Sequence, residues 1–309
     1  MRSSPAFVDD DPSYPEGGRE AWSVVFGSFC AQMCVFGVIN TSAVFQLYFA
    51  ENQLRMYDAS AIGWIFSLYL FLVYFVGMQV GPLFDQYGPR LLVGCGCILL
   101  ALSMFLLGFC SAYYQIMLDF SVLGGLGGAL INSPSLGAVA HFFHARRGLA
   151  TGLSTTAGGI GGVVFPLLLR SLLPRIGFAW ATRVVGFIVL GLAVPATLLV
   201  RSRLPPRARD TAALWPDFSM FRNAKFALLC LSIFFIEYGV LIPLAYIVSY
   251  AASFDQNTET SYVLPALLNA GSTAGRVIPG LLADKMGRFN VLILSVGLSE
   301  ATLAWCRCA

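Results

Sequence analysis

Residues 81–90 read GPLFDQYGPR, and residues 280–288 read GLLADKMGR. Both stretches fit the pattern G-x-x-x-D-x-x-G with an arginine close behind it, at Arg90 and at Arg288. Each copy occupies a short polar gap between two long apolar stretches. A charged loop with glycines that recurs in the same setting indicates that the chain is built from two like halves.

The composition is typical of a membrane protein. The chain is 57% hydrophobic and 11% charged, with a mean hydropathy of +0.75, whereas soluble domains average about 25% charged residues. Apolar stretches long enough to cross the bilayer, about 20 residues each, cover residues 22–44, 61–83, 91–110, 115–139, 149–170, 178–200, 226–251, 261–283 and 290–306. They are too long for barrel strands of about 10 residues. We therefore predict an all-α polytopic membrane protein with about nine spans.

The basic residues predict the orientation of the chain. With the N-terminus in the cytoplasm, most basic loop residues fall on the cytoplasmic side: Arg2, Arg19, Arg90, Arg146, Arg147, Arg201, Arg203, Arg207, Arg209, Arg222, Lys225, Lys285 and Arg288. Only Arg55, Arg170 and Arg175 fall outside. This asymmetry favours a cytoplasmic N-terminus, and we expect the plasma membrane as the location. Because no contiguous basic domain exists, we expect no nucleic-acid partner.

The chain divides into four parts. Residues 1–20 are polar and acidic and lack the features of a signal peptide. Residues 21–200 are predicted to form a six-helix N-terminal bundle, and residues 201–225 a basic, proline-containing cytoplasmic linker. Residues 226–309 hold three spans. Because the second loop copy follows the eighth span as the first follows the second span, the second half is expected to need six spans. We therefore predict nine of twelve spans in a partial chain with an incomplete C-terminal bundle.

The sequence carries no pattern that indicates an enzyme or a cofactor. It contains no G-x-x-x-x-G-K-[ST] phosphate loop and no nucleophile elbow or H-E-x-x-H pattern. His141 and His144 have H-x-x-H spacing, but two ligands are too few for a metal site. We predict no metal, no cofactor and no enzymatic activity.

Taken together, these features resemble the major facilitator superfamily, whose hallmark loop follows the second and the eighth of twelve helices. Within it the chain resembles the fungal-type branch of the monocarboxylate porter family. Residues 16–22, EGGREAW, are similar to that family's entry to the first helix, and residues 142–152, FFHARRGLATG, to the segment that opens its fifth helix. The resemblance implies two six-helix bundles that enclose a central site and alternate access by rocking. It also implies that the first loop packs against the eleventh helix, which is expected to be among the missing spans.

The chain departs from the porter family at three positions. Gln86 stands where the hallmark loop usually has arginine, Asn40 where the first helix usually has lysine, and Ser272 where an acid precedes the eighth-helix arginine. The arginine itself is kept as Arg276. The resemblance therefore implies a carboxylate-holding arginine without the usual proton-coupling partners. The fungal-type branch includes exporters encoded with biosynthetic pathways.

Three residues within the spans are candidates for transport chemistry. Arg276 stays charged, and placing it in hydrocarbon costs about 2.5–3.5 kcal/mol, so it needs a partner, a water-filled cavity or a route to the interface. A bidentate grip on a substrate carboxylate is one use, and Asn40 is a second candidate for substrate binding. Glu237, near the middle of the seventh span, is the candidate for proton coupling. It is expected to hold a proton or to pair with Arg276; a purely structural hydrogen bond is the alternative.

The two loop copies predict a cytoplasmic gate, held by charge pairs and by hydrogen bonds to helix ends. Its residues are Gly81, Asp85, Gly88, Arg90, Gly280, Asp284, Gly287 and Arg288. A solvated loop is the alternative. Two further charged residues, Arg183 and Asp119, fall near the outer ends of their spans and are weaker candidates, because snorkelling to the interface accounts for such positions.

The function that follows is a secondary active transporter resembling monocarboxylate porters. Its expected partners are a small organic anion or carboxylate-bearing metabolite, protons and the lipid bilayer, with efflux of a biosynthetic product as one direction. The alternative is a non-transporting membrane sensor or an inactive, truncated carrier.

Overall fold

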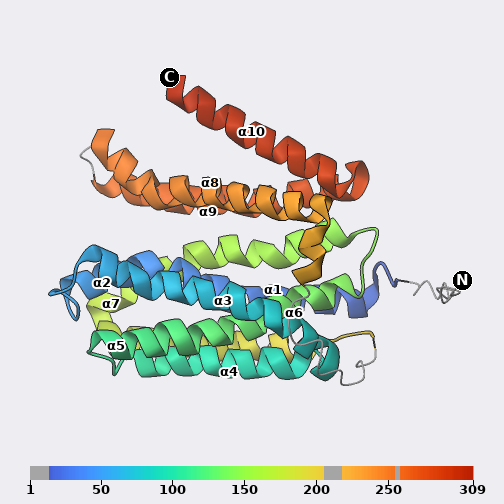
Figure 1. The fold of residues 1–309 in the computed structure, drawn as a ribbon. Coiled ribbons are helices and arrows are strands. Elements are labelled where there is room, and N and C mark those ends of the chain that lie inside the picture. The colour runs from blue at the N-terminus through green and yellow to red at the C-terminus, as the bar shows by residue number, and fades with distance from the viewer. Residues whose placement is uncertain (1–13, 205–217, 255–257, 309) are drawn as a thin grey trace, which may run out of the picture.

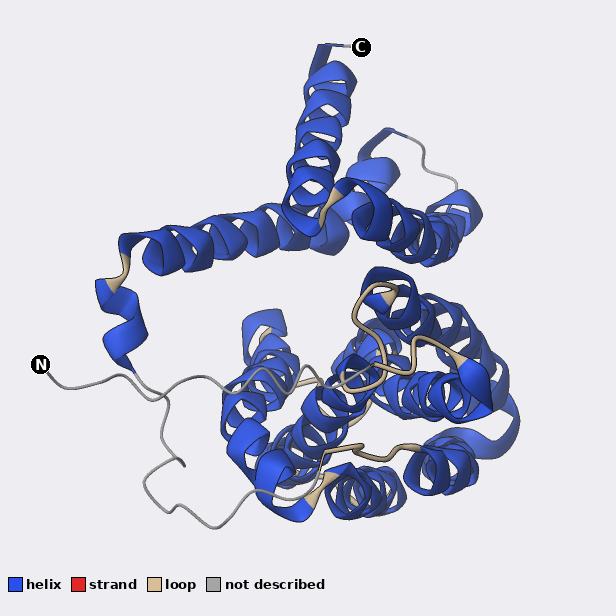
Figure 2. Ribbon diagram, turned by 90° about the vertical axis from the view of Figure 1, so that its right-hand side faces the viewer, coloured by secondary structure: helices blue, strands red, loops and turns tan. Residues whose placement is uncertain are grey.

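The structure, a computed structural model, describes residues 14–204, 218–254 and 258–308, and every regular element within these ranges is a helix (Figure 2). In chain order the helices are α1 (Gly18–Asn40), α2 (Ser42–Glu51), α3 (Ala59–Tyr87), α4 (Pro89–Leu107), α5 (Tyr113–Ile116), the π-helix η1 (Met117–Gly124), α6 (Gly125–Ala140), α7 (Arg147–Leu199), the 3-10 helix η3 (Phe218–Arg222), α8 (Ala224–Phe254), α9 (Thr258–Met286) and α10 (Arg288–Cys308).

The predicted all-α membrane fold is confirmed. Five helical stretches of the described chain are long and apolar enough to cross a membrane, and the last of them, α7, contains two predicted spans. Gly177 separates these spans, because its backbone (φ 75°, ψ 170°) leaves the helical region. Helices α8, α9 and α10 match the three remaining spans. Of the predicted N-terminal segment and linker, residues 1–13 and 205–217 lie outside the described residues.

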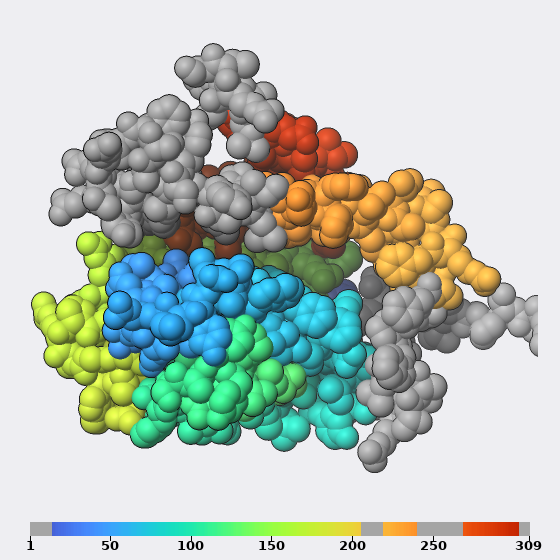
Figure 3. Space-filling model, turned by 60° about the vertical axis from the view of Figure 1, so that its left-hand side comes forward, coloured from blue at the N-terminus to red at the C-terminus, as the bar shows by residue number. Residues whose placement is uncertain are grey.

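Helix α7 joins the two parts of the molecule (Figure 1). Its first half packs on α1 and on α9, and its second half packs on α4 within the N-terminal bundle. Helices α8 and α9 lie side by side above that bundle, and α10 tilts away from them. In Figure 3 the N-terminal helices form one continuous body below the described parts of α8 and α10. The seam between α7 and α9 is therefore where the two halves meet.

An aromatic cluster fills the end of the N-terminal bundle that lies away from the two repeated loops. Phe45, Phe49 and Phe120 are fully buried, and Phe66 and Phe178 nearly so. Phe45 meets Phe120 edge-to-face at 5.8 Å between ring centroids and Phe178 at 5.9 Å. Such ring pairs contribute about 0.5–1.5 kcal/mol each beyond burial. Lipid provides little hydrophobic drive for helix association, so these contacts help to hold this end together.

The repeated sequence produces the same local turn twice. Gly88 (φ 75°) ends α3, and its N–H donates to the carbonyl of Phe84 at 2.9 Å. Gly287 (φ 92°) ends α9, and its N–H donates to the carbonyl of Ala283 at 3.1 Å. Glycine adopts positive φ without the steric penalty that a Cβ brings. The second glycine of each copy is therefore required by the turn that separates two membrane helices.

Replacing Gly88 by alanine is expected to lower the free energy of unfolding by about 1–3 kcal/mol, because its φ and ψ (75° and 167°) lie in a region that other residues rarely occupy. The measurement is thermal unfolding of the purified protein in detergent. Gly63→Ala is the control, since Gly63 is a helical residue of α3 with open space around its Cα, and we expect it to be neutral or slightly stabilising. Equal unfolding temperatures for Gly88→Ala and the unmodified protein would contradict the strain argument.

Candidate functional site at the seam of the two halves

Asp284 of α9 caps the first turn of α7. The N–H of Gly148 donates to Asp284 Oδ1 at 2.7 Å, and the N–H of Leu149 donates to Oδ2 at 2.8 Å. The residue that precedes α7, Arg146, provides no side-chain cap. A carboxylate at a helix N-terminus satisfies free N–H groups and opposes the positive end of the helix dipole. An aspartate from the C-terminal half thus completes a helix of the N-terminal half.

Two further positions of the second loop copy contact the same place. Arg288 donates a hydrogen bond to the carbonyl of His144 at 3.0 Å. Gly280 packs on Gly148 so closely that a Cβ on Gly280 would lie 2.5 Å from the Gly148 carbonyl oxygen. The start of α7 is therefore held by a carboxylate, a guanidinium and a close backbone contact, all from residues 280–288.

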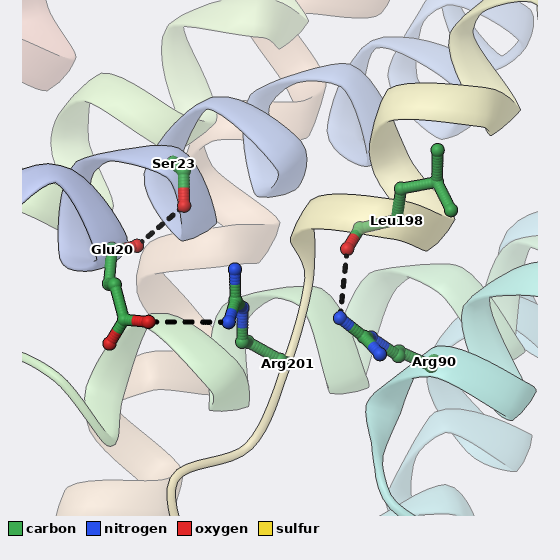
Figure 4. Close-up of polar contacts among 5 residues, drawn as sticks. All are labelled: Glu20, Ser23, Arg90, Leu198 and Arg201. Atoms are coloured by element: carbon green, nitrogen blue, oxygen red, sulfur yellow. Dashed lines mark hydrogen bonds and ion pairs between the residues drawn. The ribbon is translucent and has the colours of Figure 1, made fainter.

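The first loop copy has different partners. Arg90 donates to the carbonyl of Leu198 at 3.1 Å, at the C-terminal end of α7, beside the 3.4 Å ion pair between Arg201 and Glu20 (Figure 4). Asp85 is exposed and forms no hydrogen bond or ion pair within the described part of the chain. A Cβ on Gly81 would have no described atom within 4 Å. The two copies therefore share a local fold but not their tertiary contacts.

Glu16 holds the loop that leads into α7. Its carboxylate accepts hydrogen bonds from the N–H groups of His144 (2.8 Å), Ala145 (2.6 Å) and Arg146 (3.1 Å). Burial alone would raise the pKa of the Glu16 carboxyl, but these amides and the nearby His144 ring outweigh it, and the pKa lies below its ordinary value. Five backbone N–H groups between residues 144 and 149 thus donate to two carboxylates, those of Glu16 and Asp284.

Replacing Glu16 by glutamine is expected to destabilise the protein at pH 7 by no more than about 1 kcal/mol, since the carboxylate remains accessible to water. Because the folded-state pKa is lowered, the stabilisation is present above the unfolded-state value and is lost as pH falls through the folded-state value. Thermal unfolding temperatures of the two proteins should therefore differ at pH 7 and converge below about pH 4. A constant difference across that pH range would contradict a charge effect.

Arg276 lies against α7 at the centre of the seam. Its Nη1 donates to the carbonyl of Thr155, and its guanidinium lies 5.7 Å from the centroid of the Phe36 ring. Gly158 leaves the space that the guanidinium occupies, since a Cβ there would collide with it. The arginine is half-buried and bound to a backbone carbonyl rather than to a carboxylate, so its positive charge is not neutralised by that contact.

Asn40 reaches the same place from α1. Its Nδ2 donates to the carbonyl of Phe36 at 2.7 Å and to the carbonyl of Gly158 at 3.4 Å. Both of these residues also contact Arg276. The structure therefore brings together Asn40 and Arg276, the two residues predicted to bind substrate, around one glycine of α7.

A cavity of about 490 Å³ opens at the seam, next to Arg276. Its lining contains three arginines, two threonines and two glycines, namely Arg147, Arg276, Arg288, Thr151, Thr155, Gly148 and Gly152. No carboxylate is among these lining residues. Guanidinium groups bind carboxylates through paired, charge-assisted hydrogen bonds, so the charge of this cavity suits an organic anion.

Glu237 lies on α8, with its side chain exposed. Tyr74 of α3 interacts electrostatically with both Glu237 and Arg276. No ion pair joins Glu237 to Arg276 within the described residues. Of the two states expected from the sequence, direct pairing with Arg276 is therefore not the one seen.

The two histidines of the H-x-x-H pattern are engaged in different contacts. His141 Nδ1 lies 2.9 Å from Ser202 Oγ, and the His144 ring packs on Tyr14 at 5.2 Å between centroids. Burial lowers the pKa of His141. Within the described ranges no three His, Cys, Asp or Glu side chains are grouped as a metal ion would require.

Sequence reasoning missed the contacts made by backbone groups. The carbonyl of Thr155 and the amides of Gly148 and Leu149 carry no side-chain pattern that would reveal them. The cluster of glycines from Gly158 to Gly162 could have predicted a close helix contact at this place. It does not indicate which helix makes that contact.

The known proteins to which this chain is similar are transporters. Residues 21–306 match the Major Facilitator Superfamily. The MFS-type transporter pytF of Aspergillus terreus is 39% identical over 280 residues, which are 91% of this chain and 95% of that protein. The aspyridones efflux protein apdF of Emericella nidulans is 34% identical over 305 residues, which are 98% of this chain but 62% of that protein.

A similar fold occurs among solved structures. A crystal structure of the peptide transporter POT in complex with alafosfalin superimposes with a TM-score of 0.53 at 16% sequence identity. The match covers 78% of this chain and 51% of that one. At this identity the likeness concerns the fold alone.

Proposed function

Because this chain belongs to the Major Facilitator Superfamily and its relatives are transporters rather than enzymes, we propose that it is a secondary active carrier of a small organic acid or carboxylate-bearing metabolite. The observation that carries the proposal is the position of Arg276, half-buried at the seam and beside a cavity with two further arginines. A charged residue inside a membrane protein generally marks a substrate or ion pathway.

Arg276 and Asn40 are proposed to bind the substrate together. The guanidinium would hold the carboxylate, and the amide of Asn40 would supply one donor or acceptor to a polar group of the substrate. The Phe36 ring beneath Arg276 adds an apolar face. This combination suits a molecule with one carboxylate and an apolar body, as the resemblance to monocarboxylate porters also implies.

Glu237 is proposed to couple transport to protons. It is a carboxylate on α8 that shares the electrostatic surroundings of Tyr74 with Arg276. Binding of an anion at Arg276 would change the electrostatic potential at Glu237, and the affinity of Glu237 for a proton would change with it. We propose no metal ion and no cofactor for this cycle.

The loop of residues 280–288 is proposed to close the cytoplasmic side. Closure would be favoured by the bonds from the start of α7 to Asp284 and by the bond from Arg288 to His144. Opening would break these contacts together, since all of them involve the segment from His144 to Leu149. Residues 81–90 are proposed to have the corresponding role in the other half.

Efflux is the proposed direction, across the plasma membrane and with a cytoplasmic N-terminus. The name of apdF describes an efflux protein for aspyridones, and the basic residues of the loops fall mainly on the side assigned to the cytoplasm. The substrate would then be a product of the cell's own biosynthesis.

The test is transport by the full chain in proteoliposomes. Uptake of radiolabelled organic acids is measured with and without an imposed pH gradient, against vesicles without protein. The proposal predicts saturable uptake of a carboxylate that its uncharged amide does not inhibit. If the protein binds these acids but the vesicles never accumulate them, the result would favour a non-transporting membrane sensor.

A further inference from the structure

Asp119 is a buried carboxyl group that the proposed transport site does not use. It lies on the π-helix η1, and only 8% of its surface is exposed. Both carboxyl oxygens are shielded from solvent and have no hydrogen-bond partner within the described residues. Such an orphaned acid in the interior of a membrane protein requires an explanation.

Within the described residues, the groups next to Asp119 are apolar or uncharged. Ile116 and Phe120, on the same stretch, are fully buried apolar residues. The Ser103 hydroxyl of α4 donates to the backbone carbonyl of Asp119 at 3.1 Å and not to its side chain. The thiol of Cys110, just beyond α4, interacts electrostatically with the carboxyl, and a thiol does not neutralise a carboxylate.

The other titratable groups at this end of the bundle have different environments. Arg183 of α7 lies over the Phe109 and Trp180 rings, at 4.8 and 5.0 Å from their centroids. The Tyr69 ring of α3 packs on Phe120, and the Tyr113 hydroxyl of α5 donates to the carbonyl of Ala61. Three charged residues near the start of α3 are exposed: Glu51, Arg55 and Asp58. No described basic residue forms an ion pair with Asp119.

Two observations support a proton-binding site: the carboxyl group is buried without a partner, and it lies on a π-helical turn. An ionised carboxylate buried without a partner is destabilised by several kcal/mol, whereas the neutral acid avoids most of that penalty. The π-helical turn, with its wider hydrogen-bond pattern, is a rare element that often occurs at functional sites. It also divides this membrane helix into α5 and α6, and so provides a place where the backbone can rearrange.

We propose that Asp119 is a proton-binding site, which holds a proton in this conformation and releases it when the η1 turn opens to water. On release the O–H bond of the acid breaks, its electron pair stays on the carboxylate oxygen and the proton passes to water. In the predicted orientation this is the outer end of the bundle. That the release accompanies transport rests on the proposed function; the binding of the proton does not.

Infrared spectroscopy of the full chain tests proton binding directly. At neutral pH the unmodified protein should show the C=O stretching band of a neutral aspartic acid, assigned by its shift on ¹³C labelling of aspartate carboxyls, and Asp119→Asn should lose that band. Glu300→Gln, a change at an exposed position of α10, should keep the band. If Asp119→Asn does not fold, ¹³C labelling of aspartate carboxyls in the unmodified protein should shift the band. Absence of the band, its persistence in Asp119→Asn, or its failure to shift would overturn the proposal.

Transport measurements test the coupling. Uptake by the unmodified protein should vary with external pH, and uptake by Asp119→Asn should vary less, because only the dependence carried by Glu237 remains. An unchanged pH profile in Asp119→Asn would refute coupling through this residue. Absence of uptake by the unmodified protein would count against the proposed function, while the infrared result would still decide proton binding.

Discussion

Arg276→Ala is expected to reduce carboxylate uptake by at least about 30-fold. Removal of one member of a buried charged pair costs about 2 kcal/mol or more, and each 1.4 kcal/mol changes an equilibrium tenfold. In this protein the guanidinium lies between the Thr155 carbonyl and the Phe36 ring, facing the arginine-lined cavity. Arg276→Lys should retain a part of the activity, because lysine keeps the charge but not the bidentate geometry.

The matched control for this prediction is Arg183→Ala. Arg183 is also an arginine within a predicted span, but it lies over two aromatic rings at the far end of the bundle. We expect this variant to transport at close to the unmodified rate. The measurement is initial uptake in proteoliposomes with equal amounts of folded protein. Normal uptake by Arg276→Ala would remove the central claim about substrate binding.

Gly280→Ala is expected to separate α7 from α9 at the loop end of the seam. The new Cβ would lie 2.5 Å from the Gly148 carbonyl oxygen and 3.0 Å from its carbonyl carbon. Both are backbone atoms, so the helices must move apart. Overpacking of this kind typically costs 1–3 kcal/mol, and the same movement would lengthen the hydrogen bonds from Gly148 and Leu149 to Asp284.

Gly81→Ala is the control that the repeated loop provides. Gly81 has the same place in the motif, yet a Cβ there would meet no described atom within 4 Å. We therefore expect Gly280→Ala, and not Gly81→Ala, to lower the unfolding temperature. Gly280→Ala should also increase alkylation of a cysteine placed at Thr151, which lines the seam cavity. Equal behaviour of the two variants would show that the close contact at Gly280 has no energetic consequence.

The seam combines two properties that a rocking motion requires. Glycines of α7 allow close approach, since a Cβ at Gly152 would lie 2.5 Å from the Arg276 carbonyl oxygen. Polar groups of α9, including Thr273 and Asn269, fill the space that the other glycines leave. We propose that α7 and α9 separate along this contact when the two halves rock.

The sequence predicted the helices well because each depends on local information. Hydropathy located nine stretches that are helical in the structure, and Gly88 and Gly287 marked the turns after α3 and α9. It also marked Arg276 and Asn40 as candidates, and the structure places both beside Gly158, while their role in substrate binding stays a prediction. Direct pairing of Arg276 with Glu237, one of the two expected states, is not seen among the described residues, and Arg276 donates to a backbone carbonyl instead. Backbone acceptors are present at every residue, so no pattern of residue types predicts which one is used.

The sequence by itself determined that this protein is a bundle of membrane helices with two loops of the same local fold. In lipid only helices and closed barrels satisfy the polar groups of the backbone, and the apolar stretches are too long for barrel strands. Only the tertiary structure decided that Asp284 caps α7, that Asp85 has no such partner in the described chain, and that Asp119 is enclosed without one. Asp85 and Asp284 occupy the same place in a repeated sequence, and Asp119 lies in an unrelated stretch, yet all three are the same residue type. The differences between them depend on which distant helix lies nearby, and that is a property of packing rather than of the local chain.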